Sequence, residues 1–394
     1  MTPDPPGLCR AWLDSGGERY ESRGVRSAED PMPVDEDTLF RVASVSKLIT
    51  GAAITALGVD VDSAVRDHLP DFRLADADAA GRITVRDLLT HRAGFAPDVN
   101  KDRLADELDA GALARAVADL AVAPQISPPG RYYGYSNAGF MVLARIVEVV
   151  AGEPFEHAAR RLVLEPAGMR RSTYFTDEAV THPVALGHGG EPPRVLRPWG
   201  RSRARNGQGG LMTTARDLIA FARYTLADPG PAWEPLADGF DQGSHVGVAW
   251  NVFDLPGGGR AAGHAGHTKG YTARLTLLPD SGRAFVILAN SENAGPFLDR
   301  ETAAALGLPA EPEHEFLAAP DVRDHLGVYT DGSDQIRVDG VPDGVVLSEQ
   351  GLGRVRFIAP DEGRADHGLL VRFLREDGRV SHLRLAGKLL RKVS

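Results

Sequence analysis

The chain has 394 residues with an ordinary globular composition, 43% hydrophobic and 25% charged, and its length suggests two or three domains around a large core. Its net charge of −10 argues against a nucleic-acid partner, which would require a basic surface. No run of about 18 apolar residues is present, so the sequence predicts no transmembrane span.

The first residues, Met1 to Cys9, lack the basic start and the apolar stretch of a secretory signal peptide. We therefore expect a cytoplasmic location, with no membrane partner. Cys9 is the only cysteine, which excludes an internal disulfide. The segment that follows, to about residue 42, predicts a β-hairpin that begins a sheet, because two short strand-like runs flank Ser15-Gly16-Gly17.

The central motif of the sequence is a Ser-x-x-Lys that runs from Ser44 to Lys47. Apolar residues recur at helical spacing after Ser44, so the stretch predicts a helix that starts at this serine and ends near Gly58. Lys47 then lies one turn along the same face, with the two Cβ atoms roughly 5–6 Å apart. A serine hydroxyl needs a base to remove its proton, and a lysine can be that base when burial lowers its pKa. The free N–H groups of the helix start also favour negative charge.

Further segments at 83–95, 103–122 and 138–165 predict helices by the same spacing, the first of them ending at Gly94. They suggest a helical subdomain beside an α/β sheet domain. His91, inside the first segment, is interpreted as a structural residue. A helix is also expected near 209–218, with Thr213 or Thr214 as its N-cap.

A loop precedes the second candidate motif, Tyr135-Ser136-Asn137. The run Ser127-Pro128-Pro129-Gly130 cannot be helical and forces the chain into a loop that leads to Tyr135. Such a tyrosine alone would be interpreted as packed aromatic surface. The asparagine two residues later and the upstream Ser-x-x-Lys favour a functional role instead.

The third motif is His264-Ala265-Gly266, which precedes a strand predicted over 271–278. That strand forms a hairpin with 283–290. Glycines at 266 and 270 would let a substrate lie against the strand edge. His264 and His267 could also suggest a metal, but no further ligands follow at the usual spacing, and we expect neither a metal nor a cofactor.

The order Ser-x-x-Lys, Tyr-x-Asn, His-x-Gly resembles the serine β-lactamase and penicillin-binding-protein superfamily over roughly residues 10–300. The tyrosine in the second motif is similar to the branch of class C β-lactamases, D-aminopeptidases and family VIII esterases. The resemblance implies a β-lactamase/transpeptidase-like α/β fold, in which an antiparallel sheet is flanked by helices. After residue 320, short strands with turn signals such as Asp377-Gly378 predict a small antiparallel sheet or barrel, which resembles the lipocalin-like domain of some superfamily members.

The same resemblance assigns roles to individual residues. It implies that Tyr135 shares a proton with Ser44 and Lys47 and passes it to the leaving group, while Asn137 positions Lys47 and the substrate. It places the oxyanion hole at the backbone N–H groups of Ser44 and His267. His264 stands where many relatives have lysine. Ala265 and Gly266 would contact substrate, although Ala265 departs from the commoner threonine or serine.

We therefore predict a hydrolase domain at 8–308 and a small β domain at 320–394. The predicted function is a serine hydrolase that cleaves an ester or amide of a small molecule or peptide through an acyl-enzyme on Ser44. Acyl transfer or peptide cyclisation from the same acyl-enzyme is the alternative, and a non-catalytic ligand sensor is a third interpretation. The Arg-rich segment 194–205 could form a lip for an anionic substrate, or simply a solvated loop. An α/β-hydrolase is disfavoured, because the nearest match to Gly-x-Ser-x-Gly has one residue too many.

Overall fold

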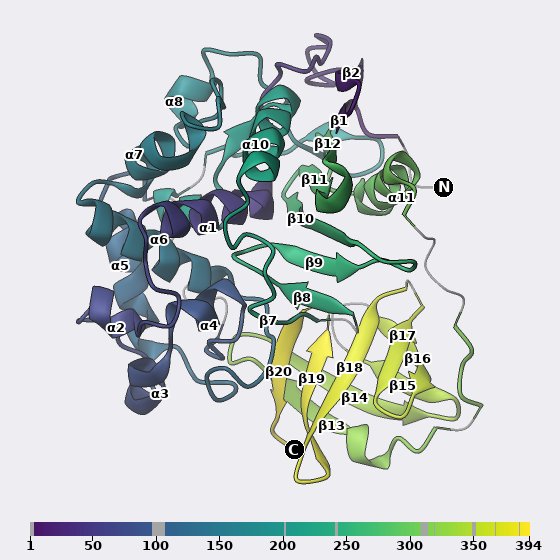
Figure 1. Ribbon diagram of the computed structural model, residues 1–394. Helices are drawn as coiled ribbons and strands as arrows, with labels where there is room; N and C mark the ends of the chain where they lie inside the picture. The colour runs from purple at the N-terminus through teal and green to yellow at the C-terminus, as the bar shows by residue number, and fades with distance from the viewer. Residues whose placement is uncertain are drawn as a thin grey trace. The chain divides into compact units, whose positions relative to one another are not determined.

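The computed structural model describes residues 4–96, 107–200, 202–240, 243–308, 314–318, 320–348, 352–366, 368–385 and 387–394. The chain divides into two compact units (Figure 1). The first contains residues 1–63, 101–117 and 140–310, and the second contains residues 64–100, 118–139 and 311–394. The C-terminal β domain therefore packs with two earlier segments of the chain, which the sequence had placed in the hydrolase domain.

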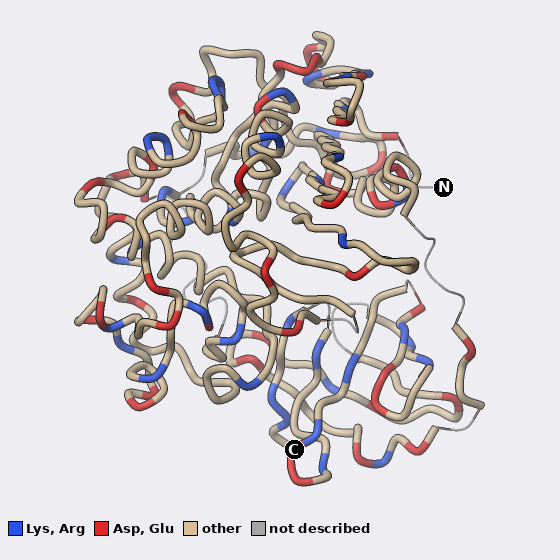
Figure 2. Tube along the Cα trace, in the orientation of Figure 1, with Lys and Arg blue, Asp and Glu red and all other residues tan. Residues whose placement is uncertain are grey.

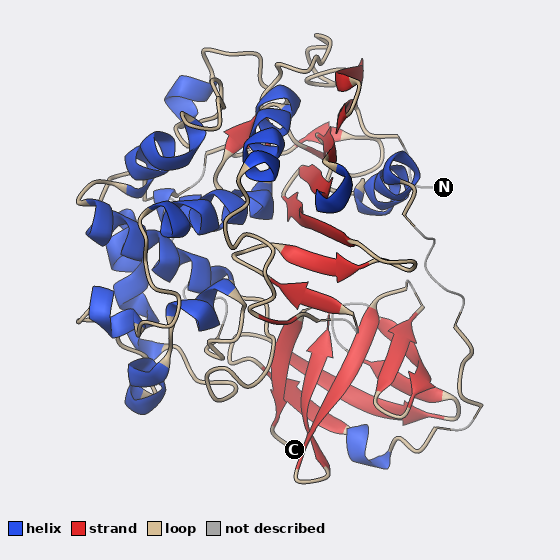
Figure 3. Ribbon diagram, in the orientation of Figure 1, coloured by secondary structure: helices blue, strands red, loops and turns tan. Residues whose placement is uncertain are grey.

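The first unit contains an eight-stranded antiparallel sheet with the order β2-β1-β12-β11-β10-β9-β8-β7 (Figure 3). The hairpins predicted at the start of the chain and at 271–290 are confirmed as β1–β2 and β11–β12. The strands are β1 (Gly7–Asp14), β2 (Gly17–Gly24), β7 (Ala237–Asp238), β8 (Ser244–Val246), β9 (Asn251–Asp254), β10 (Arg260–Thr268), β11 (Tyr271–Leu278) and β12 (Arg283–Ala289). Two short two-stranded sheets pair β3 (Phe40–Arg41) with β6 (Met212–Thr213) and β4 (His188–Gly189) with β5 (Arg194–Val195).

Helices cover both faces of this sheet, which explains why β12 is apolar at successive positions. Phe285 and Ile287, on one face of β12, share a hydrophobic cluster with Leu298 and Leu306 of α11 (Gly295–Leu306). Helix α10 (Ala215–Ala227) packs against β1 and β12, and Figure 1 shows it on the other side of the strands from α11. The N-cap of α10 is Thr214, whose hydroxyl accepts from the N–H of Asp217 at 3.0 Å.

The remaining helices of the first unit lie beside the sheet. The predicted helix 138–165 is wrong as a continuous element, since Gly152 and Pro154 interrupt it. Helix α6 begins in the second unit and ends in the first. These helices are α1 (Ser46–Ala56), α5 (Ala112–Ala118), α6 (Asn137–Ala151), α7 (Phe155–Ala159) with a following π-helical turn (Arg160–Leu164), α8 (Thr176–Ala179) and α9 (Asn206–Gly209). None of the helices in the described ranges is both long and apolar enough to cross a lipid bilayer.

The second unit combines short helices with a closed β-barrel. The helices are α2 (Val65–His68), α3 (Ala77–Arg82) and α4 (Val85–Leu89). The predicted helix 83–95 is wrong at its end, because α4 stops before His91, whose φ of +58° cannot continue a right-handed helix. The start is set by Thr84, whose hydroxyl accepts from the N–H of Asp87 at 3.2 Å.

The barrel consists of eight antiparallel strands that close where β13 meets β20. Its interior is filled by aromatic and aliphatic side chains, among them Tyr329, Phe357 and Phe373. The sequence missed one strand, β17, because its residues Glu-Gly-Arg-Ala lack a strand-like pattern. The strands are β13 (Gly327–Thr330), β14 (Gln335–Val341), β15 (Gly344–Leu347), β16 (Gly353–Ala359), β17 (Glu362–Ala365), β18 (Leu370–Glu376), β19 (Arg379–Leu385) and β20 (Lys388–Lys392).

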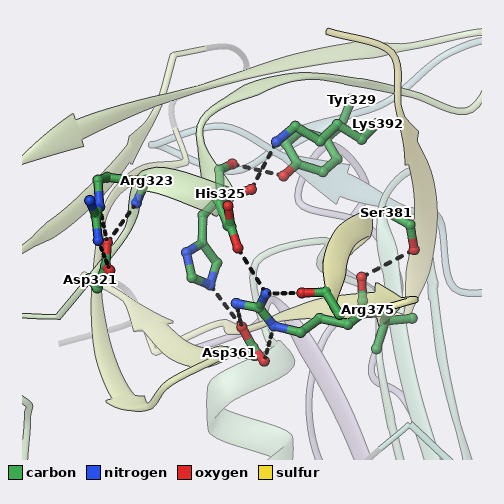
Figure 4. Close-up of polar contacts among 11 residues, drawn as sticks. Asp321, Arg323, His325, Tyr329, Asp361, Arg375, Ser381 and Lys392 are labelled. Carbon is green, nitrogen blue, oxygen red and sulfur yellow. Dashed lines mark hydrogen bonds and ion pairs between the residues drawn. The ribbon is translucent and has the colours of Figure 1, made fainter.

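A polar cluster ties the segment before β13 to the barrel (Figure 4). Buried His325 lies with Nε2 2.9 Å from Asp361, and Arg375 donates two hydrogen bonds of 2.9 Å to the same carboxylate. Arg375 also pairs with Asp324 at 3.0 Å. Figure 2 shows that basic and acidic residues are interspersed along the described trace.

Candidate active site

Ser44 and Lys47 are brought together as the sequence predicts. Ser44 lies in a 3₁₀ turn, Ala43–Val45, that leads directly into α1. Lys47, in the first turn of α1, is completely buried, and its Nζ donates to Ser44 Oγ at 3.2 Å and to the carbonyl oxygen of Gln208 at 2.8 Å. The ring of Phe140 lies 5.3 Å from the same nitrogen. A potential nucleophile and a potential base are therefore in hydrogen-bond contact.

The turn that carries Ser44 is strained and locally supported. Ala43 has a φ of +46°, a conformation that a residue with a side chain adopts only when its surroundings impose it. Ser46 provides one such support, since its hydroxyl donates to the carbonyl of Ala43 at 2.6 Å and accepts from the N–H of Leu211 at 3.0 Å. The second serine of Ser-Val-Ser-Lys is thus a structural residue, a role that the sequence pattern does not indicate.

Residues 206–211 form the other wall around Lys47. Besides the Gln208 carbonyl, the Gly207 carbonyl accepts from the hydroxyl of Thr50 on α1 at 2.7 Å. A side chain at Gly207 would collide with Ala144 on α6, so this backbone approaches the helices closely only because it is glycine. The sequence did not indicate this contact, because a main-chain acceptor for the lysine leaves no signature in side-chain identity.

Strand β10 places the third motif beside this turn. A Cβ at Gly266 would collide with the carbonyl oxygen of Val42, so the strand can cross residues 42–43 at this distance only with glycine there. His264 lies two residues earlier and therefore shares the face of Gly266. The pairing of β9 with β10 runs from Arg260 to Gly263, so the ladder with β9 along this edge ends at the residue before His264. This edge is the one along which a substrate was expected to lie.

His264 is a neutral side chain in this environment. Burial, and then the positive charge of Lys47, lowers its pKa from 6.5 to about 3. Its Nδ1 lies 2.6 Å from the carbonyl oxygen of Ala265, an acceptor, so the proton is on Nδ1 and Nε2 is the accepting nitrogen. The protein therefore presents a hydrogen-bonding group without a permanent charge at this position.

Ala265 and His267 lie on the opposite, exposed face of β10. His267 Nε2 is 2.9 Å from the carbonyl oxygen of Glu292, which fixes its ring on that side. Because His264 and His267 point to opposite faces of the strand, the two imidazoles cannot share one metal ion. The oxyanion hole at the N–H groups of Ser44 and His267 stays a prediction.

Tyr135 and Asn137 belong to the second unit. Tyr135 lies in the loop before α6, and its backbone N–H donates to the carbonyl of Gly387 at 2.7 Å. Its ring centroid is 4.4 Å from that of His91. Asn137 is the first residue of α6. The predicted cooperation of these two residues with Ser44 and Lys47 stays a prediction.

Two arginines of the Arg-rich segment 194–205 are engaged with the protein's own carboxylates. Arg203 donates to both oxygens of buried Glu156, at 2.9 and 2.8 Å, and Asn206 donates to the same carboxylate at 2.7 Å. Arg197 pairs with Glu29 at 2.6 Å. The two paired arginines favour a structural role over an anion-binding lip; Arg201 lies outside the described residues.

Acidification is expected to destabilise the protein through His264. Between pH 7 and pH 5 the free energy of unfolding should fall by about 2 kcal/mol on account of this residue. In the unfolded chain the imidazole takes up a proton below its ordinary pKa of 6.5, whereas in the folded protein it stays neutral down to a pKa of about 3. The stability is full above pH 6.5 and is lost as the pH falls toward 3.

Chemical denaturation of the wild type and of His264→Gln at both pH values measures this effect. The variant should lose less stability than the wild type over the same interval, by about the same 2 kcal/mol. The other titrating groups are common to both proteins and cancel. An equal pH dependence of the two proteins would contradict the assignment.

Comparison with known proteins identifies the family of the chain. The sequence profile of the Beta-lactamase family matches residues 4–308. Penicillin-binding protein 4 from Amycolatopsis lactamdurans is 30% identical over 348 residues, which cover 78% of this chain and 87% of that protein. Esterase EstB from Burkholderia gladioli is 30% identical over 256 residues, covering 55% of this chain and 64% of the esterase. The crystal structure of SurE has a similar fold, with a TM-score of 0.80 at 24% identity, covering 99% of this chain and 95% of that one. The resemblance inferred from the three motifs is confirmed: the chain belongs to the Beta-lactamase family, a family of serine hydrolases.

Proposed function

We propose that the protein hydrolyses an ester or amide of a small molecule or peptide through an acyl-enzyme on Ser44. The observation that carries the proposal is the hydrogen bond from the completely buried Lys47 to Ser44 Oγ. Through this contact the lysine can take up the hydroxyl proton whenever its amine is neutral. The names of two relatives, a penicillin-binding protein and an esterase, support the same class of chemistry.

The proposed reaction has two halves. Ser44 Oγ attacks the substrate carbonyl while Lys47 takes the hydroxyl proton, and the N–H groups of Ser44 and His267 stabilise the oxyanion. Tyr135 passes a proton to the departing alcohol or amine and receives the serine proton from Lys47 in its place, and the acyl group stays on Ser44. Water then attacks the acyl-enzyme and gives the free acid, with the serine restored. Asn137 holds Lys47 and the substrate in position.

The first test is incubation with p-nitrophenyl esters, D-amino-acid amides and a cephalosporin, with intact-mass measurement of the protein. A covalent adduct that maps to Ser44 is expected with at least one ester or amide. A protein that turns over none of them and never gains mass would favour the interpretation as a non-catalytic ligand sensor.

Cephalosporin hydrolysis is expected to be slower than cleavage of a short-chain ester, judged by kcat/KM. Ala265 lacks the hydroxyl that relatives would offer to a β-lactam carboxylate, and a hydrogen bond to a charged group contributes about 1.5–3 kcal/mol. Ala265→Thr, at an exposed strand position, should therefore raise cephalosporin kcat/KM about tenfold or more and leave ester kcat/KM nearly unchanged. A wild type that prefers the cephalosporin would contradict this prediction.

Product partitioning decides between hydrolysis and acyl transfer. Transfer requires an acceptor with an effective molarity high enough to outcompete water. With an acyl donor and added amines or alcohols at millimolar concentration, free acid should be the main product by mass spectrometry. An excess of transfer product over free acid would replace the hydrolase by an acyltransferase or peptide cyclase that uses the same acyl-enzyme.

A further inference from the structure

The loop that carries Tyr135 is held by hydrogen bonds at three consecutive backbone N–H groups, all within the second unit. The N–H of Gly134 donates to the carbonyl of His91 at 2.8 Å, and that of Tyr135 donates to the carbonyl of Gly387 at 2.7 Å. The N–H of Ser136 donates to Nδ1 of the His91 imidazole at 3.1 Å. Two residues distant in the chain, His91 and Gly387, therefore hold the backbone on both sides of the tyrosine.

His91 adopts an unfavourable conformation to make these contacts. It is buried, and its φ of +58° is uncommon for a residue with a side chain. Its ring is inclined by 33° to the ring of Tyr135, with the centroids 4.4 Å apart. His91 therefore makes three contacts with one loop, through its carbonyl, its imidazole nitrogen and its ring. Together these contacts restrain the path of the loop backbone and the position of the tyrosine ring.

Gly387 belongs to the turn between β19 and β20 of the barrel, and this turn lies directly on the tyrosine loop. A Cβ at Gly387 would be 3.4 Å from Cβ of Tyr135 and 3.5 Å from the ring of Tyr133. In the reverse direction, a Cβ at Gly134 would be 2.9 Å from Cβ of Leu389 on β20. Glycine at position 134 therefore permits a close approach of the tyrosine loop to β20 that a side chain would prevent.

Further contacts join the same part of the barrel to the segment before the loop. Nε2 of His382 on β19 lies 3.0 Å from the carbonyl of Ile126, and Tyr132 donates to the carbonyl of Arg375 on β18 at 3.3 Å. Ile126 and Leu389 belong to one hydrophobic cluster, with Tyr132 packed against it. The segment from Ile126 to Tyr135 is thus packed on strands β18, β19 and β20 of the barrel.

We propose that the C-terminal barrel is part of the catalytic apparatus, and that Gly387 and His91 are positioning residues for Tyr135. This inference rests on the proposed function, in which the phenol of Tyr135 transfers the proton of the leaving group. Catalytic side chains must be held within about 0.5 Å of their productive positions, and a displacement of about 1 Å can lower turnover about a hundredfold. The barrel turn and His91 supply that restraint to the tyrosine backbone.

A matched pair of glycine substitutions tests the role of the barrel turn. Gly387 has a φ of +83° and Gly378, in the β18–β19 turn, has a φ of +79°, so alanine is strained equally at both. A Cβ at Gly378 would meet nothing within 4 Å, whereas a Cβ at Gly387 would lie in van der Waals contact with Tyr135. The carbonyl of Gly387 also accepts from the N–H of Tyr135, so a shift of this strained backbone would displace the tyrosine. Gly387→Ala should lower kcat for a p-nitrophenyl ester about tenfold to a hundredfold with KM nearly unchanged. Gly378→Ala should lower the Tm to a similar extent and leave kcat unchanged, and equal kcat in the two variants would overturn the role of the turn.

A second pair of variants, at position 91, separates loss of the histidine contact from a general loss of stability. This pair also tests the proposal if Gly387→Ala does not fold. Asparagine and glycine both tolerate the left-handed backbone at position 91, but only asparagine offers a side-chain oxygen near the place of Nδ1. His91→Asn should retain a kcat about tenfold above that of His91→Gly, at similar KM. Equal activity of these variants would remove His91 from the proposal. If no acyl-enzyme formed on Ser44 of the wild-type protein, the proposed function itself would be contradicted.

Discussion

Replacement of Ser44 by alanine is expected to lower kcat by at least about 10³-fold, because removal of a nucleophile leaves only substrate binding and oxyanion stabilisation. The hydroxyl is the acceptor of the Lys47 hydrogen bond at 3.2 Å, and Ser44 lies in the 3₁₀ turn that leads into the helix carrying this lysine. Ester hydrolysis and intact-mass labelling both measure the loss. The variant should form no covalent adduct.

Ser46→Ala is the matched control, two residues away in the same turn. Its hydroxyl joins Ala43 to Leu211, so its loss should cost about 1 kcal/mol of stability per hydrogen bond. The acyl adduct should still form on this variant. Near-normal turnover in Ser44→Ala, or an adduct that moves with Ser46, would overturn the mechanism.

Lys47→Ala and Tyr135→Phe are each expected to lower kcat about 10²- to 10⁴-fold, the usual contribution of a proton-transfer group. The double variant should be far less impaired than the product of the two single effects, because both residues are proposed to handle the same proton. Steady-state kinetics of the four proteins in this cycle gives the coupling directly. Fully multiplicative losses would mean that the two residues act on different steps.

The burial of Lys47 calls for a packing control. Lys47→Met keeps most of the side-chain volume next to Phe140 and removes only the amine. Its kcat should fall as far as that of Lys47→Ala, while its Tm should stay closer to that of the wild type. A Lys47→Met variant with substantial activity would show that the amine is dispensable.

The sequence alone determined the features that short stretches specify. Ser44 and Lys47 are three residues apart in one helical turn, so their contact follows from helix geometry. The tight hairpin at Asp377-Gly378 follows from turn chemistry, because both residues adopt positive φ there. Chain order and residue type were also enough for the three motifs that place the chain in its family.

Tertiary structure alone decided the features that depend on distant groups. Helix α4 ends before His91, whose imidazole accepts a hydrogen bond from the N–H of Ser136, 45 positions later in the chain. No local sequence signal indicates this contact. Nothing in the sequence distinguishes Gly387 from the other glycines, and only the fold of the barrel places its carbonyl at the N–H of Tyr135. The lowered pKa of His264 comes from burial and from the charge of Lys47, which lies on another element. Periodicity and turn residues report local backbone preference, whereas desolvation, close backbone approach and imposed strain arise only when remote segments pack together.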